Sequence, residues 1–207
     1  ELILARTLGT HFHRDGGHVD QPERLYRAYD VRAGGSAVAC LFRDHSLSDL
    51  IGFTYAGWPA DAAADDFTAK LVAAGRQYAE RTGGGEATIP IILDGENAWE
   101  HFEGGGRPFL RALYGRLSSH PELRTITMQE AARQPAGVLD GIFPGSWIDA
   151  NFYIWIGHRD DHLAWSQLAE ARQAVTTPNG DPAAAARGRE EVLIAVGTDW
   201  VWWHGAG

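Results

Sequence analysis

Apolar residues recur at helical spacing in one long segment, residues 61–81. The members of this stripe are Phe67, Leu71, Ala74 and Tyr78. A spacing of three to four positions places them on one face, so the segment is predicted to be an amphipathic helix. Aspartates gather in its first turns, where the helix dipole favours negative charge. A run of glycines follows at 83–85, where the helix is expected to end.

Other stretches predict further helices. Their expected ranges are 1–8, 107–119, a short one beginning near Met128, 161–175 and 182–195. Pro108 and Pro182 lie at the start of two of them, where the N–H that proline lacks would have no helical partner. Asp181, directly before Pro182, is expected to cap the last helix by accepting a hydrogen bond from its first turn.

Continuous apolar runs predict strands that are buried on both faces, as in a parallel sheet. The expected strands of this kind are 36–42 and 88–93, and further strands are expected at 29–32 and 123–127. The run from Ala37 to Phe42 is expected to lie centrally in the sheet. Because a long helix separates this run from Ile91-Ile92-Leu93, the two strands and the helix form a predicted βαβ unit with parallel strands.

Length and composition favour one folded domain or part of a larger one. The chain has 207 residues, of which 44% are hydrophobic, enough for a sizeable core. Its formal net charge of −9 argues against nucleic acid or an anionic membrane as a partner, because both attract basic surfaces. A neutral ligand fits this charge better.

The single cysteine and the short apolar runs argue against a disulfide-rich or cysteine-zinc protein and against a membrane-spanning protein. Cys40 is the single cysteine, so no disulfide framework or cysteine-based zinc site forms within the chain. No apolar run approaches the roughly 18 residues of a membrane span, and no signal peptide is visible, so a cytoplasmic location is expected. The chain begins with Glu1 instead of methionine, and we expect its natural N-terminus to lie upstream.

Chemically active side chains concentrate directly after the predicted strand 88–93. They are Asp94, Glu96, Asn97, Trp99 and Glu100. Ligands of α/β sheets and barrels bind at the carboxyl ends of the strands, where Asp94 would stand. The alternative is an ordinary turn, because Asp-Gly is a common turn pair. The density of polar groups favours a binding site over that alternative.

A second polar cluster follows the predicted strand 36–42. Its candidates are Arg43, Asp44, His45 and Asp49. Arg43 and His45 offer hydrogen-bond donors to the hydroxyl groups of a ligand, and the two aspartates orient them. The alternative is the capped start of a helix, with Asp44 or Ser46 as the N-cap residue. Both interpretations stay open at this point.

The stretch Leu93–Glu100 closely resembles the LDGENPWE motif of glycoside hydrolase family 57, with Ala98 in place of the proline. Further stretches resemble the amylopullulanase-like branch of that family. They are Phe42-Arg43-Asp44, Leu47-Ser48-Asp49, Ile51-Gly52-Phe53, Gly145-Ser146-Trp147, Ile154–Gly157 and Asp199–Gly205. In the last of these, Val201 and His204 depart from the family pattern.

The resemblance implies a retaining glycosidase or transglycosidase of the α-amylase and amylopullulanase type that acts on α-glucans, with Asp94 as its general acid/base. The implied substrate-binding residues are Arg43, Asp44, His45, Asp49, Glu96, Asn97, Trp99, Glu100, Trp147, Asp199, Trp202, Trp203 and His204. No cofactor and no metal is implied. The family's nucleophile is a glutamate in an earlier region, which we do not find in this sequence. The chain is therefore expected to be the second half of a catalytic domain and to be inactive alone.

The fold that this resemblance implies is α/β. Residues 1–157 would form a partial (β/α)7-type barrel with parallel strands, and residues 158–207 the start of a helical subdomain. The expected partners are an α-glucan and the remainder of the same catalytic domain, with no nucleic acid and no membrane.

Two functions of other classes compete with this interpretation. A metal-dependent polysaccharide deacetylase has a similar barrel and needs an aspartate and two histidines as ligands. The candidates are His11, His13, Asp15 and His18, whose spacing matches no helical or strand ligand pair. A non-catalytic glucan-binding module would instead use the eight tryptophans, whose flat faces stack on pyranose rings. For any single tryptophan, a place in the core is the favoured alternative.

Overall fold

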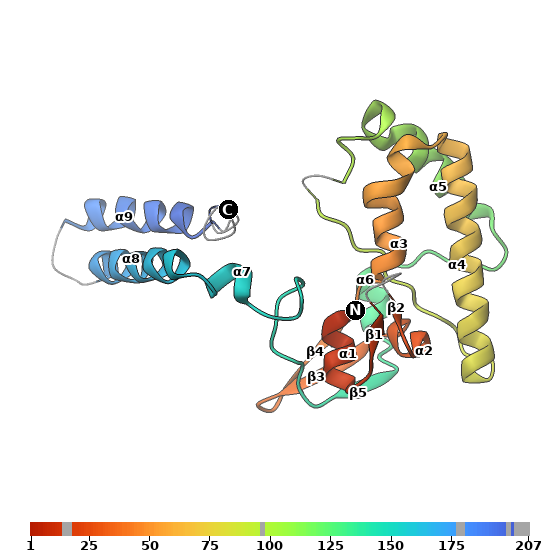
Figure 1. The fold of residues 1–207 in the computed structure, drawn as a ribbon, viewed down its shortest axis with the longest axis horizontal. Helices are drawn as coiled ribbons and strands as arrows, with labels where there is room; N and C mark the ends of the chain where they lie inside the picture. The colour runs from red at the N-terminus through yellow and green to blue at the C-terminus, as the bar shows by residue number, and fades with distance from the viewer. Residues whose placement is uncertain (14–17, 96–97, 177–180, 198–199, 201–207) are drawn as a thin grey trace. The chain divides into compact units, whose positions relative to one another are not determined.

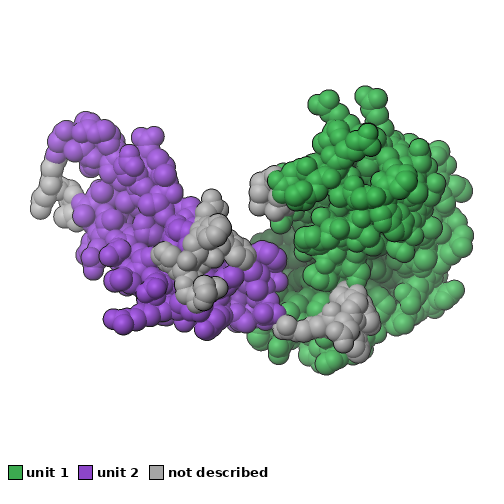
Figure 2. All heavy atoms as spheres, turned by 45° about the horizontal axis from the view of Figure 1, so that its top comes forward, with its two compact units in different colours: residues 1–143 green, residues 144–207 purple. Residues whose placement is uncertain are grey.

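The computed structural model describes the chain except for residues 14–17, 96–97, 177–180, 198–199 and 201–207, and except for the side chains of residues 13, 18 and 19. The chain divides into two compact units, Glu1–Phe143 and Pro144–Gly207 (Figures 1 and 2). Helices and a small sheet together make a mixed α/β fold, as expected. The predicted domain boundary at residue 157 and the predicted partial barrel stay predictions.

The first unit contains most of the helices and strands. In chain order, they are α1 (Leu2–Leu8), β1 (Phe12–His13), β2 (His18–Val19), α2 (Pro22–Leu25), β3 (Tyr29–Ala33), β4 (Ser36–Cys40), α3 (His45–Asp49), α4 (Ala60–Thr82), α5 (Arg107–Ser119), α6 (Met128–Ala132) and β5 (Gly137–Leu139). A π-helical turn (Leu50–Thr54) and a 3-10 turn (Tyr55–Gly57) connect α3 to α4, and a second 3-10 turn (Glu103–Gly106) precedes α5. The second unit contains α7 (Tyr153–Ile156), α8 (Arg159–Thr176) and α9 (Pro182–Ala195).

The predicted helices are confirmed close to their expected ends. The long helix α4 ends at Gly83, whose φ of 72° is left-handed and therefore favours glycine. The range of α5 agrees with the prediction at both ends. Asp181 caps α9, because its side-chain oxygen Oδ1 accepts a 3.0 Å hydrogen bond from the Ala183 N–H.

The sheet has the strand order β4-β3-β5, with β3 at its centre. β3 and β4 pair in antiparallel fashion and place Ala33 opposite Ser36, so the hairpin loop consists of Gly34 and Gly35. Both glycines have positive φ, 55° and 84°, as a tight hairpin turn requires. β5 lies parallel to β3 on the other side. The predicted central position of β4 is therefore wrong, because β4 has one neighbour among the described strands and most of its side chains are exposed.

The segment 88–93 is not a strand, so the predicted βαβ unit is also wrong. The Thr88 N–H donates to the Tyr26 carbonyl at 2.9 Å, but the segment enters no sheet ladder among the described strands. Ile91 and Leu93 pack against the core on one face, whereas Ile92 is 37% exposed. An extended segment that buries alternate side chains against helices needs no neighbouring strand. The segment 123–127 likewise forms no strand, contrary to the prediction.

Two apolar clusters make up the core of the first unit, and α4 contributes to both. Phe67 lies in the first cluster with Tyr55 and Phe109, which are all almost completely buried. Tyr78, near the other end of α4, lies in the second cluster with residues of α1, α2 and the sheet, including Leu4. Figure 1 shows α4 alongside α5 in one region and reaching α2 in the other. This helix therefore joins the sheet region to the helical region.

The second unit is an antiparallel helix pair, α8 and α9, preceded by the short α7. Asp161 is completely buried and accepts a hydrogen bond from the His158 N–H at 3.0 Å. The indole N–H of Trp165 donates to the Trp155 carbonyl at 2.9 Å, which ties α8 to α7. Trp155, predicted to be a core residue, is half-buried. In the described part of the chain, no helix has the length and apolar character that crossing a membrane would need.

Candidate active site

Asp94 ends the extended segment that packs on the first core cluster. Leu93, directly before it, lies against that cluster, whereas Asp94 is exposed. No hydrogen bond or ion pair of the Asp94 side chain is found in the described part of the chain. The carboxylate is thus held at the surface by an anchored neighbour and open to a ligand. Glu96 and Asn97, two predicted substrate-binding residues, lie outside the described residues.

Trp99 anchors the other side of the motif. Its ring lies 5.5 Å from the ring of Phe102 and 6.4 Å from that of Phe109, between centroids. Gly106 packs so closely that a Cβ there would lie 2.7 Å from Trp99 Cε3, and its φ of 76° is left-handed. These contacts make Trp99 a partly buried structural residue, and its sugar-binding role stays a prediction. Glu100 is exposed, and its carboxylate lies 3.3 Å from His101 Nε2.

The second polar cluster brings three of its predicted residues together. The Arg43 guanidinium donates from Nη2 to Asp49 Oδ1 at 2.8 Å. His45 Nε2 lies 3.0 Å from the other oxygen of the same carboxylate, Oδ2. Arg43 Nε is buried and has no hydrogen-bond partner among the described residues. Asp49 therefore holds two donor groups side by side, and the Arg43 side chain, 33% exposed, keeps part of its guanidinium within reach of an oxygen ligand.

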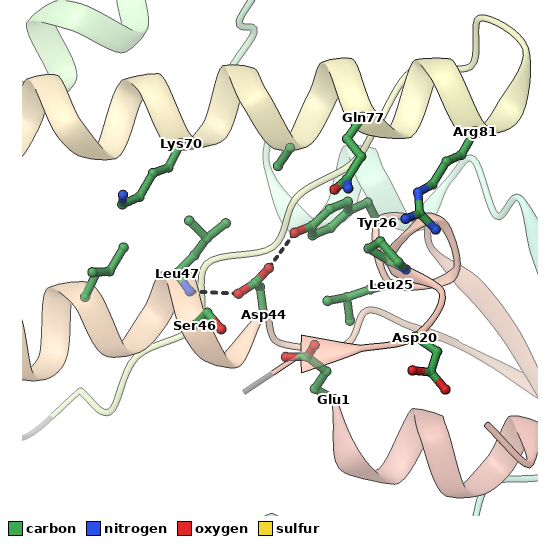
Figure 3. A pocket seen from close by; sticks show the side chains of 13 residues that line it. Glu1, Asp20, Leu25, Tyr26, Asp44, Ser46, Leu47, Lys70, Gln77 and Arg81 are labelled. Carbon is green, nitrogen blue, oxygen red and sulfur yellow. Dashed lines mark hydrogen bonds between the residues drawn. The ribbon is translucent and has the colours of Figure 1, made fainter. Parts of the chain in front are cut away.

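Asp44 has a structural position that only one of the two interpretations predicted. Its Oδ1 accepts a 2.7 Å hydrogen bond from the Leu47 N–H, so Asp44, and not Ser46, is the N-cap of α3. Oδ2 accepts a 2.6 Å hydrogen bond from the Tyr26 hydroxyl (Figure 3). Asp44 is only 5% exposed. Burial, followed by the charge of Asp44 and its hydrogen bond, raises the pKa of Tyr26 well above the usual value for tyrosine.

A pocket of about 700 Å³ lies next to this pair (Figure 3). Asp44 and Tyr26 line it together with Lys70, Gln77 and Arg81, which α4 contributes. Figure 3 shows Gln77 directed toward Tyr26, with Lys70 and Arg81 on either side of it along α4. Asp94 is not among the lining residues, so this pocket is separate from the predicted acid/base. No sequence motif contains Tyr26, Lys70 or Gln77, so nothing in the sequence indicated that these residues line a pocket.

Comparison with protein families bears on the competing functions. The model of glycosyl hydrolase family 57 matches residues 10–139, most of the first unit. The matched range includes both the cluster at 43–49 and the motif at 93–100. The chain belongs to glycosyl hydrolase family 57. A search of curated proteins found no match.

Membership of glycosyl hydrolase family 57 makes the chain a glycoside hydrolase with a carbohydrate substrate. Both polar clusters of the first unit border the same core, because Leu47 of α3 belongs to the cluster against which Leu93 packs. The scaffold thus gives the segments 43–49 and 93–100 a common support. The amylopullulanase-like branch is a finer assignment that the family match leaves as a prediction.

The remaining predicted site residues lie beyond the range that matches family 57. Trp147 is in the second unit, where it is 66% exposed. It is followed by Asp149 and Ala150, which both have positive φ, 53° and 52°. Asp199, Trp202, Trp203 and His204 lie outside the described residues. Trp200 is described, and its ring lies 5.1 Å from that of Trp165.

The histidine-rich segment proposed for the deacetylase alternative contains two short paired strands. β1 and β2 pair in antiparallel fashion, with His13 opposite His18. Asp15 lies outside the described residues, as do the side chains of both these histidines. No group of metal-binding side chains occurs among the side chains that are described. The deacetylase alternative gains no support from the family match, which names a different enzyme class.

Proposed function

We propose that this member of glycosyl hydrolase family 57 acts on α-glucans with retention of configuration, as a hydrolase or transglycosidase, and that Asp94 is its general acid/base. The observation that carries this proposal is the position of Asp94. Its carboxylate is exposed, has no partner among the described residues, and follows a segment anchored by Leu93. A proton donor that must reach a glycosidic oxygen needs this combination of access and fixed position.

In the proposed reaction, Asp94 gives its proton to the oxygen of the departing sugar and later removes a proton from the water or sugar hydroxyl that replaces it. Retention also requires a second carboxylate as nucleophile, about 5–5.5 Å from the first. We assign none of the described carboxylates to that role. The 207 residues alone are therefore expected not to cleave α-glucan.

The cluster of Arg43, His45 and Asp49 is the proposed sugar-binding group of the first unit. Sugar hydroxyls accept and donate hydrogen bonds, and the cluster offers the partly exposed Arg43 guanidinium beside the partly exposed Asp49 carboxylate. Asp44 supports this group indirectly, because it caps α3, which carries His45 and Asp49. The same proposal includes a further set of substrate-binding residues, namely Glu96, Asn97, Trp99, Glu100, Trp147, Asp199, Trp202, Trp203 and His204.

Replacement of Asp94 by asparagine in the natural protein tests the proposal. Asparagine keeps the size of the side chain but cannot donate a proton, so hydrolysis of α-glucan is expected to fall by about 10²–10⁴-fold. Hydrolysis of a substrate with an acidic leaving group should fall less, because that group departs without protonation. Binding of α-glucan should persist in both the original protein and the variant.

The control is Asp140→Asn, which removes another exposed carboxylate of the first unit that has no partner among the described residues. Its activity should equal that of the original protein. An Asp94→Asn variant with full activity would overturn the assignment of Asp94. A protein that binds α-glucan but cleaves none before the substitution would instead indicate a binding module.

A further inference from the structure

A second pocket of about 570 Å³ gathers positive charge in a chain that is acidic as a whole. Three arginines, Arg24, Arg27 and Arg81, line it, and Glu23 is the one carboxylate among the lining residues. The lining therefore carries a formal charge of +3 − 1 = +2, against −9 for the chain. The pocket lies within the first unit, between α2, the C-terminal end of α4 and β5.

Two of the arginines are held in place by contacts that leave most of their donors unused. Arg27 donates from Nε and Nη2 to the Glu23 carbonyl, at 3.0 and 2.8 Å, and its guanidinium lies over the Tyr78 ring at 5.9 Å. Arg81 donates from Nη1 to Glu23 Oε2 at 3.2 Å. A guanidinium has five N–H donors, so each retains free ones.

Arg24 is the third member and has the freest side chain. It is exposed, and no hydrogen bond or ion pair of its guanidinium is found in the described part of the chain. Its backbone is fixed nonetheless, because its carbonyl accepts a hydrogen bond from the Tyr29 hydroxyl at 2.5 Å. Arg27 and Arg81 thus have anchored side chains, which lowers the entropy that a ligand would have to remove, whereas the Arg24 side chain can turn toward a ligand from a fixed backbone.

The pocket beside Asp44 provides an internal comparison. Arg81 lines both pockets, but the pocket beside Asp44 also has three carboxylates, those of Glu1, Asp20 and Asp44. Its lining therefore carries no excess of positive charge. Grouped guanidinium groups attract anions, and the single Glu23 carboxylate leaves the second pocket with an excess of positive charge, so this pocket is the one suited to an anion.

From these contacts we infer that the pocket formed by Arg24, Arg27 and Arg81 binds a phosphate monoester or inorganic phosphate. A phosphate monoester carries a charge of about −1.5 to −2 and three terminal oxygens, which suits a lining of +2 with several guanidinium forks. A carboxylate has half that charge and two oxygens. Leu8, Val138 and Leu139 add an apolar wall for the organic part of a ligand. This inference does not rest on Asp94.

Calorimetric titration of the natural protein tests the inference, with inorganic phosphate, glucose 6-phosphate and glucose as probes. Both phosphate probes are expected to bind saturably below about 10 mM, and glucose is expected not to bind at this pocket. Tighter binding of glucose 6-phosphate than of phosphate assigns the pocket to a phosphorylated sugar, and equal binding assigns it to free phosphate. Absence of saturation by either phosphate probe overturns the inference.

Single-residue variants test whether the phosphate probes bind at this pocket. Arg24→Gln should weaken the binding of both phosphate probes about tenfold, and Arg24→Lys less, because lysine keeps the charge but loses the fork. The matched control is Arg111→Gln, at an exposed arginine of α5 without a partner in the described part of the chain. It removes the same charge and should leave binding unchanged. Equal binding by Arg24→Gln and the original protein, or an equal loss in Arg111→Gln, overturns the inference.

Discussion

The hydroxyl group of Tyr26 donates a 2.6 Å hydrogen bond to Oδ2 of the buried Asp44, 18 positions further along the chain. Tyr26 directly follows α2, and Asp44 caps α3 with its other oxygen, which accepts from the Leu47 N–H. Both oxygens of a carboxylate that is 5% exposed therefore have a donor. A single side chain thus connects α2 to the helix that carries the proposed sugar-binding cluster.

Removal of the Tyr26 hydroxyl should destabilise this connection. Tyr26→Phe leaves one oxygen of a buried carboxylate without its donor, so we expect the free energy of unfolding to fall by about 1–3 kcal/mol. Urea denaturation measures the change. Tyr114→Phe is the control, because Tyr114 is exposed on α5 and no hydrogen bond of its hydroxyl is found in the described part of the chain. Equal stability of the two variants would show that the Tyr26–Asp44 bond contributes nothing.

Alkaline pH should destabilise the first unit through its buried tyrosines, Tyr26 and Tyr55 among them. Burial raises the pKa of both Tyr26 and Tyr55, and the hydrogen bonds to Asp44 and Asp66 raise it further. A pKa that is higher in the folded state means that the stabilisation is fully present below pH about 10, the pKa of tyrosine in the unfolded chain, and is lost as pH rises above it.

Urea denaturation between pH 8 and about 11 measures this loss. Tyr26→Phe should be less stable than the original protein at pH 8 but should show a shallower decline in the free energy of unfolding above pH 10, because one ionising group has gone. An equally steep decline in Tyr26→Phe would contradict the assignment. Tyr114→Phe again serves as the control and should decline as steeply as the original protein.

Gly106 is predicted to be intolerant of any side chain. Its φ is 76°, and a Cβ would lie 2.7 Å from Trp99 Cε3. Gly106→Ala should therefore lower the free energy of unfolding by about 1–3 kcal/mol, through backbone strain and displacement of the Trp99 ring. A change in the intrinsic fluorescence of the folded protein should accompany the loss, although the chain's other tryptophans dilute it.

The control for this prediction is Gly115→Ala on α5. A Cβ at Gly115 meets no atom within 4 Å, and alanine is preferred over glycine inside a helix by about 1 kcal/mol. Gly115→Ala should therefore be slightly stabilising, so the two substitutions have opposite expected signs. A stabilising Gly106→Ala would show that Trp99 does not pack on that residue.

Asp49 is predicted to govern substrate binding by holding Arg43 and His45. Asp49→Asn removes the charge that both groups contact at 2.8 and 3.0 Å, so their positions become less defined. If the cluster binds sugar hydroxyls, KM should rise about tenfold while kcat changes less. Asp140→Asn is the matched control. A fall in kcat with constant KM would contradict a role in binding.

Local sequence patterns were sufficient to predict the helices. The apolar stripe of α4, the proline at the start of α5 and the Asp181 cap of α9 each depend on residues within one or two turns of one another. Such short-range patterns can be read without knowing the rest of the fold. The motif around Asp94, which the family match includes, was likewise visible as a continuous stretch.

Sequence alone determined which residue types are close along the chain, and only the tertiary structure decided which distant segments meet. The apolar runs 36–42 and 88–93 look alike, yet β4 lies at the edge of the sheet, whereas 88–93 packs on helices and joins no ladder of the described strands. The Tyr26–Asp44 bond and the three-arginine pocket likewise join residues from separate elements. The physical reason is that strand pairing and buried hydrogen bonds depend on partners supplied by remote parts of the chain, which local spacing does not specify.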